Sequence, residues 1–436
     1  MQGLRRAMPD IVVIVALFVL PLVVFFPQTL GGQTLIPTEN AFQYEPYASA
    51  REAVGAPERP HNHLLSDLIL QNYQWKSFTR AQLALGEVPL WNPHQFAGIP
   101  FLAAGQHSAL YPLSIIYYVM PLWVAYGWFT VVNLWLAGVF MYFFTRGLGI
   151  GRAGAMLAGV IYQLGGFVLA SVVFQMMIGA LPWLPLILLM LEYILREKRL
   201  FGRKTVIPWV AIGAVALAMN VLAGHVELTL YTLLISGFYA GIRWLHDAMR
   251  VRDLRHTLEQ AGWMLAVVVL GMSLAALQFI PLYDFVQTNW RAERNDYETV
   301  VSFAHPARDV LQFALPNFYG NPTHHQIFNL FTGEWVSEWA TDTENFAPQT
   351  HTDWGIKNYV EGALYLGILP LILALYGLVE RGMWMMSQRE NMVKMFMREP
   401  PYRAIFAILA LLSLAFMFGT PLYRMIYVLP GFNQLN

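Results

Sequence analysis

The chain has 436 residues, of which 57% are hydrophobic and only 12% charged. An ordinary soluble domain carries about 25% charged residues, so this composition indicates an integral membrane protein. The formal net charge of zero argues against a nucleic-acid partner, and the lack of cysteine excludes disulfides, zinc–thiolate sites and thiol nucleophiles.

The N-terminus carries Arg5 and Arg6 before an apolar run at 11–26. No small-x-small cleavage site follows this run, so we expect a signal anchor that is retained as the first transmembrane helix, within residues 1–30.

A transmembrane helix needs roughly 20 mostly apolar residues. By this criterion we expect an all-α, polytopic integral membrane protein with about nine transmembrane helices. The nine predicted spans are 11–30, 122–145, 153–173, 177–195, 206–223, 226–242, 261–281, 359–379 and 404–420.

The distribution of charge predicts the orientation of these spans. With the N-terminus inside and the spans alternating, 18 of the 27 lysines and arginines fall on the inner side. Acids show the opposite preference, with 18 of 27 outside, where 9 of the 11 histidines also lie. Because basic loops stay on the cytoplasmic side, we expect a cytoplasmic N-terminus and a polar extracytoplasmic surface.

The first loop, residues 31–121, is far longer than a connection between two spans requires, which is typical of a functional element. Asn62 can cap a helix over 63–85, which Gly86 and Pro89 would end. Asp67, Gln71 and Gln74 share one face of this helix. An apolar stripe is formed by Leu64, Leu68, Trp75, Phe78 and Leu85.

This pattern predicts an amphipathic helix lying in the membrane interface, with Lys76 and Arg80 able to reach lipid phosphates. Periodicity alone favours the simpler interpretation, a juxtamembrane helix with a solvated Asp67. Rigid turns follow at Pro89–Pro93 and Gly98–Pro100. Trp91 could stack on a sugar ring or a lipid; Asn92 lies beside it, and Gln106 and His107 precede the return to the bilayer.

Three further features face the predicted outer side. His225 and Glu227 form a tight turn between two spans, where a binding role and a helix-end hydrogen-bonding role are both open. The second outer loop, 283–358, is expected to cap the same surface as the first loop. Its His324, His325 and Asp353 could bind a divalent metal, but they match no compact ligand motif and ordinary loop polarity explains them better. No cofactor is assigned with certainty.

We therefore expect five units, the last of which ends soon after a span, as in a piece of a longer protein. They are a signal anchor (1–30), the first extracytoplasmic loop (31–121), helices two to seven (122–282), the second loop (283–358) and helices eight and nine (359–436).

Several motifs together resemble those of the YfhO family of bacterial membrane proteins. They are Asp67-x3-Gln71, Leu85-Gly86-x2-Pro89-Leu90-Trp91-Asn92-Pro93, Gly98-x-Pro100, Gln106, Tyr111-Pro112, Gly224-His225 with Leu230-Tyr231, Leu315-Pro316 with Gly320, and Tyr365-x-Gly367-x2-Pro370. The resemblance implies a relation to GT-C-fold glycosyltransferases of the cell envelope. It also implies a polyprenyl-phosphate sugar donor and an envelope polymer or lipid as the acceptor.

By this resemblance an acid of the first outer loop is the catalytic base, with Asp67 the best match and Glu39 the second. Lys76, Arg80 and His225 are then candidates to stabilise the leaving lipid phosphate. Two other classes remain open: a lipid or polysaccharide transporter without transferase chemistry, and a non-catalytic subunit of a membrane-protein complex. The expected location is the bacterial cytoplasmic (inner) membrane.

Overall fold

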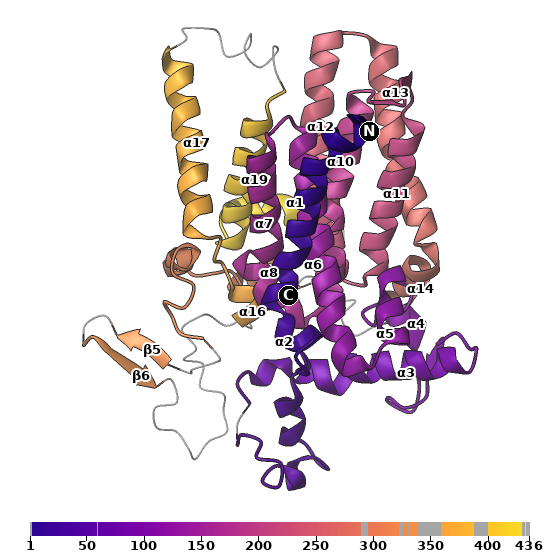
Figure 1. Cartoon of the computed structure of the whole chain (residues 1–436), viewed down its shortest axis with the longest axis vertical. Coiled ribbons are helices and arrows are strands. Elements are labelled where there is room, and N and C mark those ends of the chain that lie inside the picture. Colours follow the sequence, from indigo (N-terminus) through magenta and orange to yellow (C-terminus); the bar gives the residue numbers. More distant parts are fainter. Residues whose placement is uncertain are drawn as a thin grey trace.

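The computed structural model of the chain describes residues 2–58, 60–288, 295–321, 326–329, 332–337, 359–387, 400–429 and 432. Long helices run side by side, and the N-terminus lies at one end of this bundle (Figure 1). We call this end the N-terminal end. The other end, where most of residues 31–121 lie, is called the loop end.

Nearly all of the regular secondary structure in the described residues is helical. The α-helices are α1 (Gln2–Val24), α2 (Phe26–Thr29), α3 (Tyr73–Ala84), α4 (Phe101–Ala104), α5 (Ile115–Val119), α6 (Leu122–Gly147), α7 (Arg152–Leu164), α8 (Gly166–Ala170), α9 (Gln175–Ala180), α10 (Trp183–Leu195), α11 (Ile207–Leu222), α12 (Val226–Val251), α13 (Leu254–Leu274), α14 (Ala276–Gln287), α15 (Tyr297–Ser302), α16 (Tyr359–Gly362), α17 (Ile368–Ser387), α19 (Tyr402–Met417) and α20 (Arg424–Tyr427).

Tighter helical turns and short hairpins connect them. The turns are η1 (Thr38–Gln43), η2 (Ala48–Ala50), η3 (His63–Leu65), η5 (Pro112–Ser114), η6 (Ser171–Val173), η8 (Ala307–Phe313), η9 (Pro421–Tyr423) and one π-helical turn, η4 (Leu68–Asn72). The antiparallel hairpins pair β1 (Trp91–Asn92) with β2 (Ile99–Pro100), β3 (Arg199–Leu200) with β4 (Arg203–Lys204), and β5 (Gln326–Asn329) with β6 (Glu334–Ser337).

The prediction of an all-α polytopic membrane protein is confirmed. Among the described residues, 6 helices are long and apolar enough to cross a membrane, or up to 7 if a bent pair counts as one span. These are Ala7–Val24, Leu122–Gly147, Arg152–Val173, Gln175–Leu195, Val226–Val251 and Leu254–Leu274, with Tyr402–Met417 and Pro421–Tyr427 as the pair, bent by 103°. Two predicted spans correspond to the shorter apolar helices Ile207–Leu222 and Ile368–Glu380.

The long helices alternate in direction, so the α6–α7, α10–α11 and α12–α13 connections lie with the N-terminus (Figure 1). One contact fixes this arrangement directly. The Arg152 guanidinium, at the start of α7, donates to both carboxylate oxygens of Asp10 in α1, at 2.9 and 3.2 Å. The connections with the most basic residues therefore gather at one end, as the charge distribution predicts.

The core is aromatic and forms where α6 meets α9, α10 and α11. Tyr117, Phe129 and Trp183 are buried there. Tyr111 reaches this core from the first loop, where its hydroxyl donates to Asn133 Oδ1 (2.9 Å) and accepts from the Trp183 indole (3.2 Å). The first loop is thus anchored inside the bundle by hydrogen bonds that satisfy its buried polar atoms.

A buried ion pair, which the span analysis did not anticipate, joins α10 to α12. Arg243 donates from Nε and Nη2 to the two oxygens of Glu192, at 3.0 and 2.9 Å. Tyr239 (2.7 Å) and Tyr402 (2.5 Å) donate to the same carboxylate, and so does Arg196 (2.5 Å). Glu192 lies in the last turn of α10, so this network sits near the N-terminal end and ties α10, α12 and α19 together.

Helix formation over 63–85 is observed, but in three segments and with a different buried face. Figure 1 shows α3 crossing the end of the bundle, as an interfacial helix would. The buried residues of this region are Leu68, Asn72, Lys76 and Thr79, whereas Leu64 and Leu85 are exposed. Two polar residues, Asn72 and Lys76, face the protein, where Asn72 accepts from the Tyr126 hydroxyl and Lys76 donates to the His107 carbonyl. Of the predicted apolar stripe only Leu68 is fully buried, and on the predicted polar face Asp67 and Gln74 are exposed.

Candidate functional site

The Trp-Asn-Pro turn is part of the β1–β2 hairpin of the first loop. In this hairpin Trp91 pairs with Pro100 and Asn92 pairs with Ile99. Gly98 has φ +121°, and a Cβ there would lie 2.6 Å from the Trp91 ring, so only glycine fits beneath the indole. Asn92 is buried and bonds to Gln95 Oε1 (3.2 Å) and to the His94 amide (3.0 Å), a structural role. Trp91 remains 54% exposed and open to a ligand.

The position of Lys76 is not the expected one, in which its side chain reaches lipid phosphates. It is 1% exposed. Its ammonium donates to the His107 carbonyl (2.6 Å) and lies 4.6 Å from the centre of the Tyr117 ring. Burial lowers the pKa of Lys76 to about 7. The structure therefore makes Lys76 a link between α3 and the loop.

His107 is equally enclosed. Its Nε2 donates to the Phe101 carbonyl (2.8 Å), its Nδ1 accepts from the Ala109 amide (2.9 Å), and the ring stacks on Phe101. Burial, with a smaller contribution from the nearby Lys76 charge, lowers the pKa of His107 to about 4. His107 is thus a neutral imidazole that holds the end of the loop.

Arg80 and Gln106 lie at the surface of the loop end, where the Arg80 guanidinium donates to the Met120 carbonyl (3.1 Å). Asp67 is also exposed, and it accepts a hydrogen bond from Gln71 Nε2 (3.2 Å), as their i, i+4 spacing predicts. None of these four side chains lines the cavity that the first loop helps to form at the loop end.

That cavity, of about 520 Å³, contains the other predicted acid, Glu39. One wall comes from η1 and the segment around His61, and an apolar wall comes from α8 and η6 through Leu169, Ala170, Val172 and Val173. The second long loop supplies Asn317 and Asn321, and α16 supplies Tyr359, whose hydroxyl donates to Asn317 (2.8 Å). Both long loops therefore meet at one site.

Glu39 and His61 form a close pair inside this cavity. The His61 ring Nδ1 lies 2.9 and 2.7 Å from the two Glu39 oxygens, and the His61 backbone amide donates to Oε2 (3.1 Å). A carboxylate accepts hydrogen bonds, so Nδ1 is the donating ring nitrogen, and in the neutral imidazole Nε2 then has a lone pair. The Glu39 side chain is 36% exposed and that of His61 58%, so a ligand can reach both.

The local fold explains why these residues meet across 22 positions of sequence. Asn40, the neighbour of Glu39, is 3% exposed and donates from Nδ2 to the Asn62 carbonyl (2.8 Å). The Asn62 side chain in turn accepts from the Leu64 amide (3.0 Å), which begins the helical region as predicted. Sequence reasoning did not select His61, because no local spacing connects it with Glu39.

His225 caps α12, where its Nδ1 accepts from the Leu228 amide (3.3 Å), and burial lowers its pKa to about 4. Glu227, in the first turn of the same helix, lines a second cavity of about 710 Å³. This cavity runs between α12, α15 and α19. Its lining is mostly apolar, with Glu227, Tyr231, His305, Ser413 and Tyr423 as polar exceptions. A mostly apolar lining with a few polar groups suits a lipid chain with a polar head.

Metal binding gains no support from the described part of the chain, which contains no group of three or more histidines, aspartates and glutamates able to hold an ion. His324, His325 and Asp353 lie outside the described residues.

Comparison with known proteins gives one family. The family model described as "Bacterial membrane protein YfhO" matches residues 56–336, well over half of the chain. The match covers the first-loop motifs, the Gly224-His225 turn and part of the second loop. Searches of curated proteins and of solved structures give no match.

Proposed function

This chain belongs to the YfhO family of bacterial membrane proteins, and on that premise we propose that it is a GT-C-type glycosyltransferase. It would transfer a sugar from a polyprenyl-phosphate donor to a cell-envelope acceptor at the loop end, which we place on the extracytoplasmic side of the inner membrane. The observation that carries this proposal is the Glu39–His61 pair in a cavity lined by both long loops.

The pair has the arrangement that general-base catalysis requires. The acceptor hydroxyl gives its proton to His61 Nε2 as its oxygen bonds to the sugar C1, while the C1–O bond to phosphate breaks and polyprenyl phosphate leaves with its electron pair. Glu39 holds His61 in the Nδ1–H tautomer and stabilises the imidazolium that forms. In this proposal His61 is the base and Glu39 positions it, whereas the family resemblance favours Asp67 as the base.

The rest of the cavity fits a sugar. Asn317, Asn321 and Tyr359 bring amide and hydroxyl groups to its rim, and Leu169 and Val172 supply an apolar wall. Sites for small ligands combine such apolar walls with a few placed polar groups. The apolar cavity between α12 and α19 is the proposed place for the lipid chain of the donor, with Glu227 and His305 near its polar end.

A transfer assay tests the proposal directly. The full chain is reconstituted in proteoliposomes with polyprenyl-phosphate sugars and an envelope extract as acceptor, and transfer is compared for wild type, Glu39→Gln, His61→Gln and Asp67→Asn. We expect both Glu39→Gln and His61→Gln to lower the rate by about 10²- to 10⁴-fold, because His61→Gln removes the general base and Glu39→Gln removes the carboxylate that orients it.

Glu52→Gln is the matched control, because Glu52 is an exposed acid of the same loop that lies outside the cavity. If Asp67→Asn loses transfer while Glu39→Gln keeps it, the base is Asp67. If all three variants transfer at the wild-type rate, general-base catalysis by this loop is ruled out.

A further inference from the structure

A third cavity, of about 370 Å³, opens at the N-terminal end, far from the proposed catalytic site in the fold. It lies where α10, α12 and the residues after them meet. Its charged and titratable lining consists of Arg196, Glu197, Arg243, His246, Asp247, Arg250 and His256. Nothing in the proposed transfer reaction uses these residues.

One wall of this cavity carries an excess of positive charge. Arg196 and Arg243 share the single buried carboxylate of Glu192, and Arg250 lies two turns after Arg243 on the same helix. The donors of Arg196 and Arg243 are used by Glu192 and by neighbouring groups, so these two guanidiniums contribute a positive field. Arg250 is exposed, and it has no hydrogen bond or ion pair to any residue that the structure describes.

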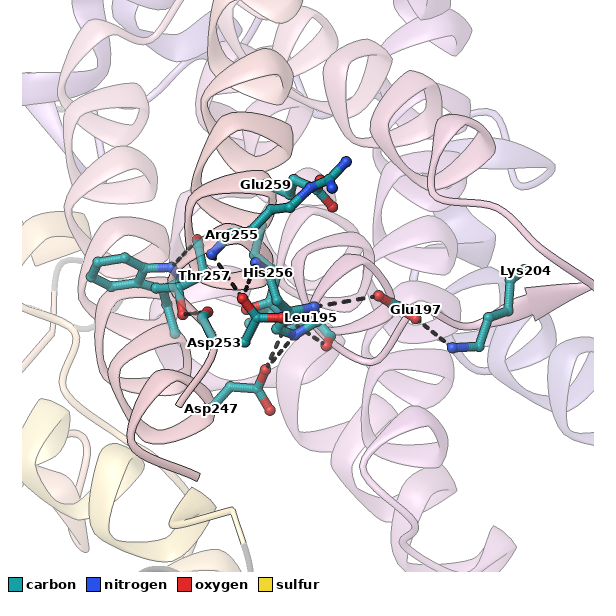
Figure 2. A network of polar contacts seen from close by, with 11 residues as sticks. Leu195, Glu197, Lys204, Asp247, Asp253, Arg255, His256, Thr257 and Glu259 are labelled. Atoms are coloured by element: carbon teal, nitrogen blue, oxygen red, sulfur yellow. Dashed lines mark hydrogen bonds and ion pairs between the residues drawn. The ribbon is translucent and has the colours of Figure 1, made fainter. Parts of the chain in front are cut away.

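The two acids that line the same cavity already have hydrogen-bond partners. Figure 2 shows His256 between Asp247 and Glu197, with its Nε2 3.1 Å from Asp247 and its Nδ1 3.6 Å from Glu197. Lys204 pairs with Glu197 (2.7 Å), and Gln260 donates to Asp247 (2.9 Å). Counted over the described residues with the histidines neutral, Arg196, Arg243, Arg250 and Lys204 carry four positive charges. Glu192, Glu197 and Asp247 carry three negative charges, so the cavity keeps a net positive charge of one.

A net positive cavity attracts an anionic group, and the surroundings of this cavity favour the headgroup of a lipid. The cavity lies at the ends of membrane-crossing helices, so it is at the level of the headgroups. Apolar side chains of α12 and α13 are exposed around it, including Leu245 (52%), Val251 (46%) and Leu254 (74%). Basic pockets between helices at such an end bind acidic headgroups.

We propose that this cavity binds the phosphate of an anionic phospholipid headgroup, with Arg250 as the hydrogen-bond donor and Arg196 and Arg243 as the positive field behind it. The acyl chains would lie on the exposed apolar side chains of α12 and α13. This site is independent of the transferase proposal, because it needs neither Glu39 nor the loop end.

The test is a binding titration on the full chain in non-ionic detergent, with water-soluble dihexanoyl-phosphatidylglycerol as the probe. Arg250→Gln should weaken binding by about tenfold or more, the usual effect of losing a charge-assisted hydrogen bond. Arg255→Gln is the control, because Arg255 belongs to the same end but is 88% exposed, pairs with Glu259 and does not line the cavity. It should bind as wild type does.

Inorganic phosphate, titrated in parallel, separates the two sources of the anion. Competition between phosphate and the lipid probe, with the lipid binding more tightly, supports the proposal. Binding of phosphate alone, with no effect of the lipid probe, overturns the lipid assignment. Equal binding of the lipid by wild type and Arg250→Gln, or no binding by wild type, overturns the site.

Discussion

Lys76 and His107 form the buried polar contact that joins α3 to the end of the first loop. A lysine beside an amphipathic stripe suggests a phosphate ligand, yet here the ammonium points inward, to a carbonyl and to the Tyr117 ring. Periodicity identifies which residues share a face of a helix, and it did so for Asp67 and Gln71. Which face is buried depends on partners supplied by distant segments, and those are not visible in a local pattern.

His107 should make stability depend on pH. Burial lowers its folded pKa to about 4 from the ordinary 6.5. Between these values the unfolded chain binds more protons than the folded one, so this contribution to stability is complete above pH 6.5 and is lost as the pH falls to 4. The full effect is about 3 kcal/mol. Thermal unfolding in detergent at several pH values measures it.

His107→Gln removes this titration and serves as the comparison. We expect its unfolding temperature to vary less than that of wild type between pH 6.5 and 4. Identical pH profiles for the two proteins would show that His107 is not held neutral by the fold.

At the scale of elements, the α11–α12 turn docks on the first loop through a backbone contact that only glycine allows. Gly224 has φ +88°, and a Cβ there would lie 2.3 Å from the Gly105 carbonyl oxygen. Ser108 strengthens the contact by donating to the Ala223 carbonyl (2.7 Å). The Gly-His turn thus packs the bundle against the first loop and also caps α12.

Gly224→Ala should destabilise the protein by about 1–3 kcal/mol, because it adds both backbone strain and a clash. Gly237→Ala is the matched control: a Cβ at this helical position meets nothing within 4 Å, and alanine favours the helix. The measurement is the unfolding temperature of each variant, which should be lower for Gly224→Ala than for Gly237→Ala. A Gly224→Ala protein as stable as Gly237→Ala would mean that the turn does not dock on the loop.

The spans themselves are predictable because apolar length is a local property, whereas the connections between elements are not. The Glu192–Arg243 pair brings together two residues 51 positions apart, and Glu39 meets His61 across a folded loop. Glu39 is only the second candidate by family resemblance, and no local pattern connects it with His61 or connects Glu192 with Arg243. The family motifs identify the first loop as a candidate site, but choosing Glu39 over Asp67 required the three-dimensional contacts.

At the scale of the whole molecule, the basic connections and the long loops lie at opposite ends of the bundle. The proposed orientation places the long loops outside, because basic loops are retained in the cytoplasm. The lack of cysteine permits a clean test. Phe96, in the first loop, is 92% exposed, and Phe201, between β3 and β4, is 95% exposed.

The test uses cells whose inner membrane is intact and whose outer membrane, where there is one, has been permeabilised. In these cells an impermeant thiol reagent should label Phe96→Cys and leave Phe201→Cys unlabelled. Both should react after the inner membrane is opened, which controls for accessibility. Labelling of Phe201→Cys alone before opening would reverse the orientation and place the proposed site in the cytoplasm.

The most direct measurement of the central claim is mass spectrometry of lipid-linked sugars and envelope glycans in a strain that lacks this protein. The strain is complemented with wild type, Glu39→Gln or Glu52→Gln at matched membrane levels. Our account predicts that a lipid-linked sugar accumulates and a glycan modification disappears in the deletion strain and with Glu39→Gln, while wild type and Glu52→Gln restore both. Unchanged lipid-linked sugars and glycans in the deletion strain would contradict it.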